Sequence, residues 1–207
     1  RAGDYSNKFY PVLGNLPIPL VLLGVPARAA GMLISNAALI GCGWVLTALV
    51  QETYGAKIAR RTLALFFFCP VTFFFSMPYT ESIFLLTTLM AVWLARRGRF
   101  GWAVVCGALA SNARMVGMAT AIPIFWEMLR RAWDDYARRK ADARRTDGAF
   151  VKRALCCVLR VLPVSVGLLL YLALNWQLYR NPLQFLIFQR ENWSQQMGSL
   201  ANTVHYT

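Results

Sequence analysis

The chain has 207 residues, of which 57% are hydrophobic and only 15% are charged. Ordinary soluble domains are about 45–50% apolar and about 25% charged. The composition excludes an intrinsically disordered chain, and five cysteines in this length exclude a small disulfide-stabilised scaffold.

The net charge of +13 would suit a nucleic-acid-binding protein, but its distribution argues against that class. Fifteen of the 22 Lys and Arg residues fall into three clusters, 57–61, 96–99 and 130–153, which lie between apolar runs. Lys and Arg concentrate in the cytoplasmic loops of membrane proteins. The pattern predicts an all-α, polytopic transmembrane protein whose three basic clusters face the cytoplasm.

The first half of the chain is predicted to enter the membrane after a broken apolar stretch. Residues 1–28 contain several Pro and Gly residues, which favour an external or interfacial segment. Residues 29–50 are long enough to cross a bilayer and lead to a cytoplasmic segment at 51–61. Residues 62–77 are expected to return to the outer side with a kink at Pro70.

A tight turn then leads into residues 83–95, which run back to the cytoplasm. Residues 100–129 fit better as two half-length segments meeting near 111–117 than as one long helix. Only a chain reversal there keeps the basic clusters on both sides of this stretch in the cytoplasm. We therefore expect short re-entrant or half-length helices, which need cover from protein or from a water-filled cavity.

The rest of the chain completes a single transmembrane domain, 1–207. Residues 130–153 carry nine Lys and Arg against four Asp and are predicted to form a cytoplasmic basic loop or surface helix. Residues 154–179 form the longest uninterrupted apolar span, which ends the helical membrane core over 29–179, and 180–207 are expected outside. Because the chain begins with Arg1 and ends in a polar run, we expect it to be a fragment with further spans on both sides.

Glu81 is the first notable ionisable residue outside the cytoplasmic clusters. It follows Tyr79 and Thr80 at the mouth of an apolar hairpin. It could bind a sugar hydroxyl, hold a cation or act as a base. Alternatively, Thr80 or Ser82 caps a helix and Glu81 interacts with the helix dipole in the first turn.

Arg114 is the second notable residue, because it interrupts an uncharged stretch of about thirty residues. A guanidinium group suits phosphate geometry, so Arg114 could bind a lipid phosphate. The alternative is a structural ion pair with Glu81 that joins two turns. The chain contains no Walker loop, GxGxxG or GxSxG motif, which leaves ATP-driven transport and hydrolase chemistry without support.

These residues belong to motifs that resemble the PIG-V-like mannosyltransferase family. PVTFFFSMPYTESIFLL (70–86), a basic turn ARRGRFGWA (95–103) and GALASNARMVGM (107–118) follow the family pattern. KFYPVLG (8–14) and GMLISN (31–36) are similar to earlier family segments, and NPLQFLIFQRENWSQ (181–195) resembles a late one. The resemblance therefore extends over nearly the whole chain.

The resemblance implies a polytopic GT-C glycosyltransferase. Such an enzyme would transfer mannose with inversion from a polyprenyl-phosphate donor to a lipid-linked or surface acceptor, with its active site on the non-cytoplasmic face. We expect a bacterial member in the plasma membrane, with membrane lipids, the donor and the acceptor as partners and no nucleic acid. Because the lipid-phosphate sugar is a substrate, no cofactor is expected; no residue is assigned as a metal ligand, and the need for a metal ion is left open.

The resemblance also suggests site residues. Glu81 and Asp4 are the catalytic candidates, and the substrate-binding candidates are Tyr79, Thr80, Arg114, Lys8, Gln189 and Trp193. The family places its key Asp in a Trp-Asp context that is missing before Phe9, where Asp4 is the only acidic residue. Either that Asp lies upstream of Arg1 or the chain lacks it. Two other functions therefore remain open, a transporter or flippase of lipid-linked sugars and a non-catalytic homologue or subunit.

Overall fold

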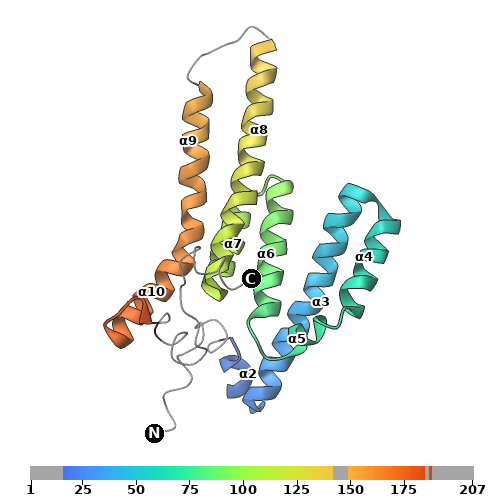
Figure 1. Ribbon diagram of the computed structural model, residues 1–207, viewed down its shortest axis with the longest axis vertical. Helices are drawn as coiled ribbons and strands as arrows, with labels where there is room; N and C mark the ends of the chain where they lie inside the picture. The colour runs from blue at the N-terminus through green and yellow to red at the C-terminus, as the bar shows by residue number, and fades with distance from the viewer. Residues whose placement is uncertain (1–15, 142–148, 185–186, 188–207) are drawn as a thin grey trace, which may run out of the picture.

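The computed structural model describes residues 16–141, 149–184 and 187, and within these ranges the chain is helical and has no strand (Figure 1). The α-helices are α2 (Ile18–Leu22), α3 (Ala27–Tyr54), α4 (Ala56–Phe68), α5 (Thr72–Ser76), α6 (Glu81–Arg96), α7 (Phe100–Ala113), α8 (Ala121–Ala141), α9 (Ala149–Val161) and α10 (Val166–Tyr179). Two 3₁₀ segments, η2 (Met115–Thr120) and η3 (Leu162–Ser165), join α7 to α8 and α9 to α10.

The helices run between two ends of the molecule (Figure 1). The end that we name the basic end contains the C-termini of α3 and α6, the start of α4 and the upper part of the α8–α9 pair. The opposite end contains the turn between α5 and α6 and the break between α7 and η2. The three basic clusters of the sequence thus lie toward one end, so far as their residues are described.

The hydrophobic core lies where α6, α7, α8 and α9 pack together. It contains mostly small side chains, including Ala91, Ala95 and Ala103, around the larger Ile124 and Met128. Small residues let helix backbones approach closely, which is how helices pack in a lipid environment. This packing fixes α6 and α7, which carry the site described below.

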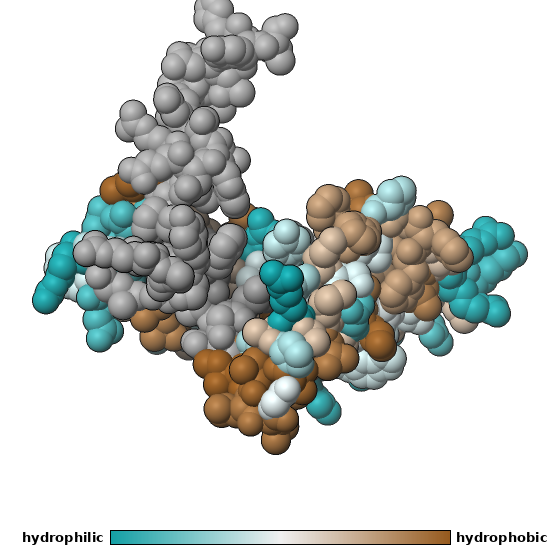
Figure 2. Space-filling view, turned by 90° about the horizontal axis from the view of Figure 1, so that it is seen from below, coloured by the Kyte–Doolittle hydropathy of each residue, from teal (hydrophilic) through white to brown (hydrophobic). Residues whose placement is uncertain are grey.

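Two helices of the described chain are long and apolar enough to cross a membrane, Ala27–Tyr54 and the nearly continuous segment Phe150–Gln177. Large apolar side chains are also exposed, and Leu22, Leu23 and Phe68 each expose 80% or more of their surface. Viewed from the opposite end, the surface shows broad hydrophobic areas between separate hydrophilic patches (Figure 2). Exposed apolar area on this scale fits contact with lipid.

The helix boundaries correct one sequence prediction, the kink at Pro70, and add detail to two others. Helix α4 begins at Ala56, because Gly55 with its φ of 84° is the whole connection to α3, and much of the segment 51–61 is therefore helical. Pro70 does not kink a helix, since α4 ends at Phe68 and Cys69 is extended. The apolar span predicted over 154–179 agrees with the candidate span Phe150–Gln177, but its helix starts earlier, at Ala149, and changes to 3₁₀ geometry at η3, where Pro163 cannot donate an amide hydrogen bond.

The predicted break near 111–117 is confirmed, because α7 ends at Ala113 and η2 follows. The segment after the break is longer than expected, however, and α8 continues to Ala141. Of the two alternatives for residues 130–153, helix is correct over 130–141 and 149–153. Polar residues on one side and apolar residues on the other let these helices continue past the core as a pair.

Candidate functional site

An ion pair between Glu81 and Arg114 joins the two turns at the opposite end. The distance from Arg114 Nη1 to Glu81 Oε1 is 2.8 Å, although 33 positions separate the residues. The Arg114 side chain is 43% exposed and the Glu81 side chain 32%. The ion pair with Glu81 that was considered for Arg114 is therefore present, and both side chains are partly exposed.

Glu81 occupies the first turn of α6, where its carboxylate also interacts favourably with the helix dipole. The predicted side-chain cap is wrong, because Thr80 at the N-cap position makes no capping hydrogen bond. The Ser82 hydroxyl instead donates to the Phe75 carbonyl oxygen, across the turn. The turn is thus held by a contact to the preceding helix, and Glu81 is left free to face Arg114.

Arg114 lies at the break between α7 and η2, where its backbone is extended with φ −153° and ψ 144°. The following 3₁₀ turn folds directly onto the end of α7. A Cβ atom on Gly117 would lie 2.1 Å from the Ala110 carbonyl oxygen, so only glycine fits there. This close approach turns the chain back and leaves the Arg114 side chain beside the start of α6.

The electrostatics of the pair leave one polar atom unused. Glu81 Oε1 accepts the bond from Arg114, whereas Glu81 Oε2 is shielded from solvent and has no hydrogen-bond partner among the described residues. A carboxylate oxygen without a partner can accept a hydrogen bond from a hydroxyl group. The half-exposed guanidinium group can still donate to an anion such as phosphate. The pair therefore combines a carboxylate oxygen that has unused acceptor capacity with a half-exposed guanidinium donor.

Of the remaining candidate residues, the structure describes two and leaves four outside the described ranges. Tyr79 is half-exposed directly before the ion pair, and Thr80 adjoins Glu81. Asp4, Lys8, Gln189 and Trp193 lie outside the described residues, so their roles stay predictions. Within the described ranges, no group of three His, Cys, Asp or Glu residues is arranged to hold a metal ion.

Sequence reasoning missed the polar residues that support these turns. The Ser76 hydroxyl donates to Asn36 Oδ1 at 2.8 Å, which ties α3 to the segment before Glu81. The Ser111 hydroxyl lies 2.6 Å from the Val164 carbonyl oxygen, which ties the end of α7 to η3. The available signal was the dipeptide Ser-Asn, which occurs twice within otherwise apolar helices.

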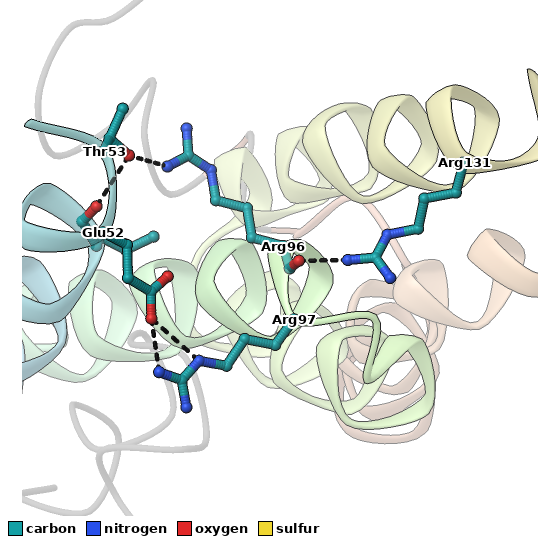
Figure 3. A network of polar contacts seen from close by, with 6 residues as sticks. Glu52, Thr53, Arg96, Arg97 and Arg131 are labelled. Carbon is teal, nitrogen blue, oxygen red and sulfur yellow. Dashed lines mark hydrogen bonds and ion pairs between the residues drawn. The ribbon is translucent and has the colours of Figure 1, made fainter. Parts of the chain in front are cut away.

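The basic end holds a different polar network (Figure 3). Arg97 donates two hydrogen bonds to Glu52 Oε1, at 2.6 and 3.2 Å, and Arg96 donates to the Thr53 hydroxyl at 2.8 Å. The Arg131 guanidinium group donates to the Arg96 carbonyl oxygen. These bonds link α3, α6 and α8 to one another, while the surrounding Lys and Arg residues keep the end positively charged.

A protein-family model described as mannosyltransferase (PIG-V) matches residues 17–181. The matched range includes both residues of the ion pair and the whole basic end. Comparisons with curated proteins and with solved structures give no significant match.

Proposed function

Because the chain belongs to the mannosyltransferase (PIG-V) family, we propose that it is a multi-pass membrane enzyme that transfers mannose from a polyprenyl-phosphate donor. The acceptor is a lipid-linked or surface glycan, and transfer takes place on the non-cytoplasmic face with inversion. The proposal is supported chiefly by the Glu81–Arg114 pair, which combines a half-exposed guanidinium group with an unused carboxylate oxygen.

The proposed face of the membrane follows from the distribution of charge. Lys and Arg residues on the cytoplasmic side orient a membrane protein, so the basic end would lie in the cytoplasm. The ion pair would then lie toward the non-cytoplasmic side, where a lipid-phosphate sugar in the outer leaflet could reach it. Ionisable side chains near apolar helices are costly to maintain, which supports a functional rather than a passive role.

In the proposed reaction the acceptor oxygen forms a bond to the anomeric carbon of mannose, while the bond from that carbon to the phosphate oxygen breaks. Arg114 would stabilise the negative charge that develops on the departing lipid phosphate. The acceptor hydroxyl would donate a hydrogen bond to Glu81 Oε2, and its proton would pass to this carboxylate. Asp4 is the second candidate for the carboxylate that accepts the proton.

Tyr79 and Thr80 would contact the sugar or the acceptor, because they lie directly before Glu81 on the same turn. Lys8 would assist Arg114 at the phosphate, and Gln189 and Trp193 would contribute to the substrate site from the C-terminal segment. Two substitutions separate these roles. Lys8→Gln should weaken binding of the donor, whereas Tyr79→Ala should weaken binding of the acceptor.

The test is transfer of labelled mannose from polyprenyl-phosphate mannose by the purified chain reconstituted in lipid vesicles. We expect label in the acceptor fraction, and about 100-fold less of it for Glu81→Gln and for Arg114→Ala, given the usual contributions of a proton acceptor and of a charge-stabilising group. Glu52→Gln removes a carboxylate from the ion pair at the basic end and is the matched control.

Three outcomes would overturn the proposal. Full transfer by both Glu81→Gln and Arg114→Ala would remove the assigned site. Movement of the intact lipid-linked sugar across the bilayer, without cleavage of its glycosidic phosphate bond, would identify a transporter. If the wild-type chain is folded in the vesicles but transfers no mannose, it is a non-catalytic homologue.

A further inference from the structure

Two of the three Ser-Asn dipeptides of the chain lie in described helices, far apart in the sequence, and contact the segments next to Glu81 and Arg114. Ser35 and Asn36 lie in α3, and Ser111 and Asn112 lie in the last turn of α7. Ser35 and Ser111 are completely buried. Hydroxyl and amide groups are expensive to bury unless they are hydrogen-bonded, so their partners indicate what these residues are for.

The first pair contacts the turn that precedes Glu81. Ser76 donates to Asn36 Oδ1 at 2.8 Å, and the Ser35 hydroxyl lies 3.5 Å from the Tyr79 carbonyl oxygen. One helical turn earlier, a Cβ atom on Gly31 would lie 2.9 Å from the Pro78 Cβ atom. The backbone of α3 and the turn therefore touch directly, and the polar bonds fix the turn along α3.

The second pair contacts the segment that packs behind Arg114. The Ser111 hydroxyl lies 2.6 Å from the Val164 carbonyl oxygen, and Asn112 Nδ2 donates to the Gly167 carbonyl oxygen at 3.0 Å. A Cβ atom on Gly167 would lie 2.0 Å from the Ala108 carbonyl oxygen. The end of α7 is thus fixed against the start of α10, by the same combination of polar bonds and close backbone approach.

We propose that the two Ser-Asn pairs are positioning residues that hold Glu81 and Arg114 in ion-pair contact for the transfer reaction. The backbone of each turn is short or irregular, so the regular hydrogen bonds of an α-helix do not hold it in place. A misplacement of about 1 Å at a reacting group can cost about 100-fold in rate. This proposal rests on the proposed function where it is tested by mannose transfer, whereas its second test, the energetic coupling between Glu81 and Arg114, does not depend on catalysis.

The structural readout is the coupling between Glu81 and Arg114, measured as melting temperatures of the full chain in detergent. In an otherwise wild-type chain we expect the effects of Glu81→Gln and Arg114→Gln on the melting temperature to be non-additive. The double variant should melt about 2–4 °C higher than a simple addition of the two single decreases would give. Asn36→Leu and Ser111→Ala should each abolish this coupling. Thr47→Val is the matched control in α3, because the Thr47 hydroxyl donates only to Gly43 of its own helix.

The catalytic readout separates positioning from general loss of structure. Asn36→Leu and Ser111→Ala should lower kcat about 10-fold while a substantial share of the chain remains folded, and they should cause no further loss in the Glu81→Gln background. Ser111→Thr keeps the hydroxyl donor and should retain most of kcat. Thr47→Val should keep both kcat and the coupling.

Undiminished coupling in both Asn36→Leu and Ser111→Ala would overturn the positioning role. Equal loss of kcat by these variants in the wild-type and Glu81→Gln backgrounds would also overturn it, since a merely structural defect lowers the active fraction in both. If the wild-type chain transfers no mannose, the proposed function fails, and the coupling measurement alone decides the positioning proposal.

Discussion

The two ends of the molecule each contain an ion pair between different helices, but the surroundings of the two pairs differ. At the basic end, Glu52 and Arg97 belong to a network that continues through Arg96 to α8 (Figure 3). At the opposite end, Glu81 and Arg114 form the sole ion pair found among the described residues of the two turns. One end distributes its charged contacts over several side chains, and the other concentrates them in one carboxylate and one guanidinium group.

This difference separates orientation and stability from chemistry. In the proposed topology, a surplus of Lys and Arg at the basic end determines the orientation in the membrane. The other pair leaves Glu81 Oε2 without a hydrogen-bond partner, which folding alone does not require. Shielded polar atoms without a hydrogen-bond partner also occur at the basic end, at Trp93 Nε1 and Arg131 Nε, but both are donors, whereas the one at the opposite end is a carboxylate oxygen, which is the kind of group that can accept a proton.

Exchange of the charges within each pair should give the largest contrast between the ends. Glu81→Arg combined with Arg114→Glu keeps the attraction but moves the carboxylate onto the break after α7. We expect mannose transfer to fall at least about 100-fold, because neither charge then meets its part of the substrate. Glu52→Arg combined with Arg97→Glu should retain transfer, and equal losses in the two double variants would abolish the distinction.

The glycines of α7 and η2 extend the comparison to backbone packing. Gly117→Ala places a Cβ atom 2.1 Å from a carbonyl oxygen, so we expect unfolding to become easier by about 1–3 kcal/mol. Gly101, at the basic end of α7, has no atom within 4 Å of a Cβ position. Gly101→Ala should therefore stabilise the chain by about 0.5–1 kcal/mol, because alanine favours the helix. Thermal unfolding in detergent measures both, and similar shifts would contradict the tight packing at Gly117.

Some of this asymmetry could be predicted from the sequence. The reversal near residue 114 followed from the two basic clusters that flank it, because both could not otherwise lie on one side of a membrane. The Glu81–Arg114 contact followed as one of two alternatives, since isolated charges among apolar helices tend to pair. Both inferences used the positions of charged residues along the chain, which the sequence alone provides.

The parts that could not be predicted depend on contacts between distant segments. Ser82 resembles a capping residue in the sequence, but its hydroxyl finds the Phe75 carbonyl oxygen once the turn is folded. The interruption at η3 and the early start of α4 depend on how the chain packs on neighbouring helices. The support that Asn36 gives to Ser76 spans 40 positions, and periodicity cannot reveal such a contact.

The smallest expected effect is on the stability of the basic end and concerns salt. Glu52→Gln should lower the melting temperature by at most about 2 °C at low ionic strength, because exposed ion pairs contribute little. The Glu52 and Arg97 side chains are 39% and 49% exposed, so salt at about 1 M should screen the interaction and remove the difference from wild type. Glu81→Gln should remain deficient in transfer at both salt concentrations, because its loss concerns a specific oxygen atom rather than attraction between charges. If high salt lowered mannose transfer by the wild-type chain as much as Glu81→Gln does, the attraction between Glu81 and Arg114 would by itself explain the role of the pair. The ion pairs at the two ends would then differ only in the size of their effect.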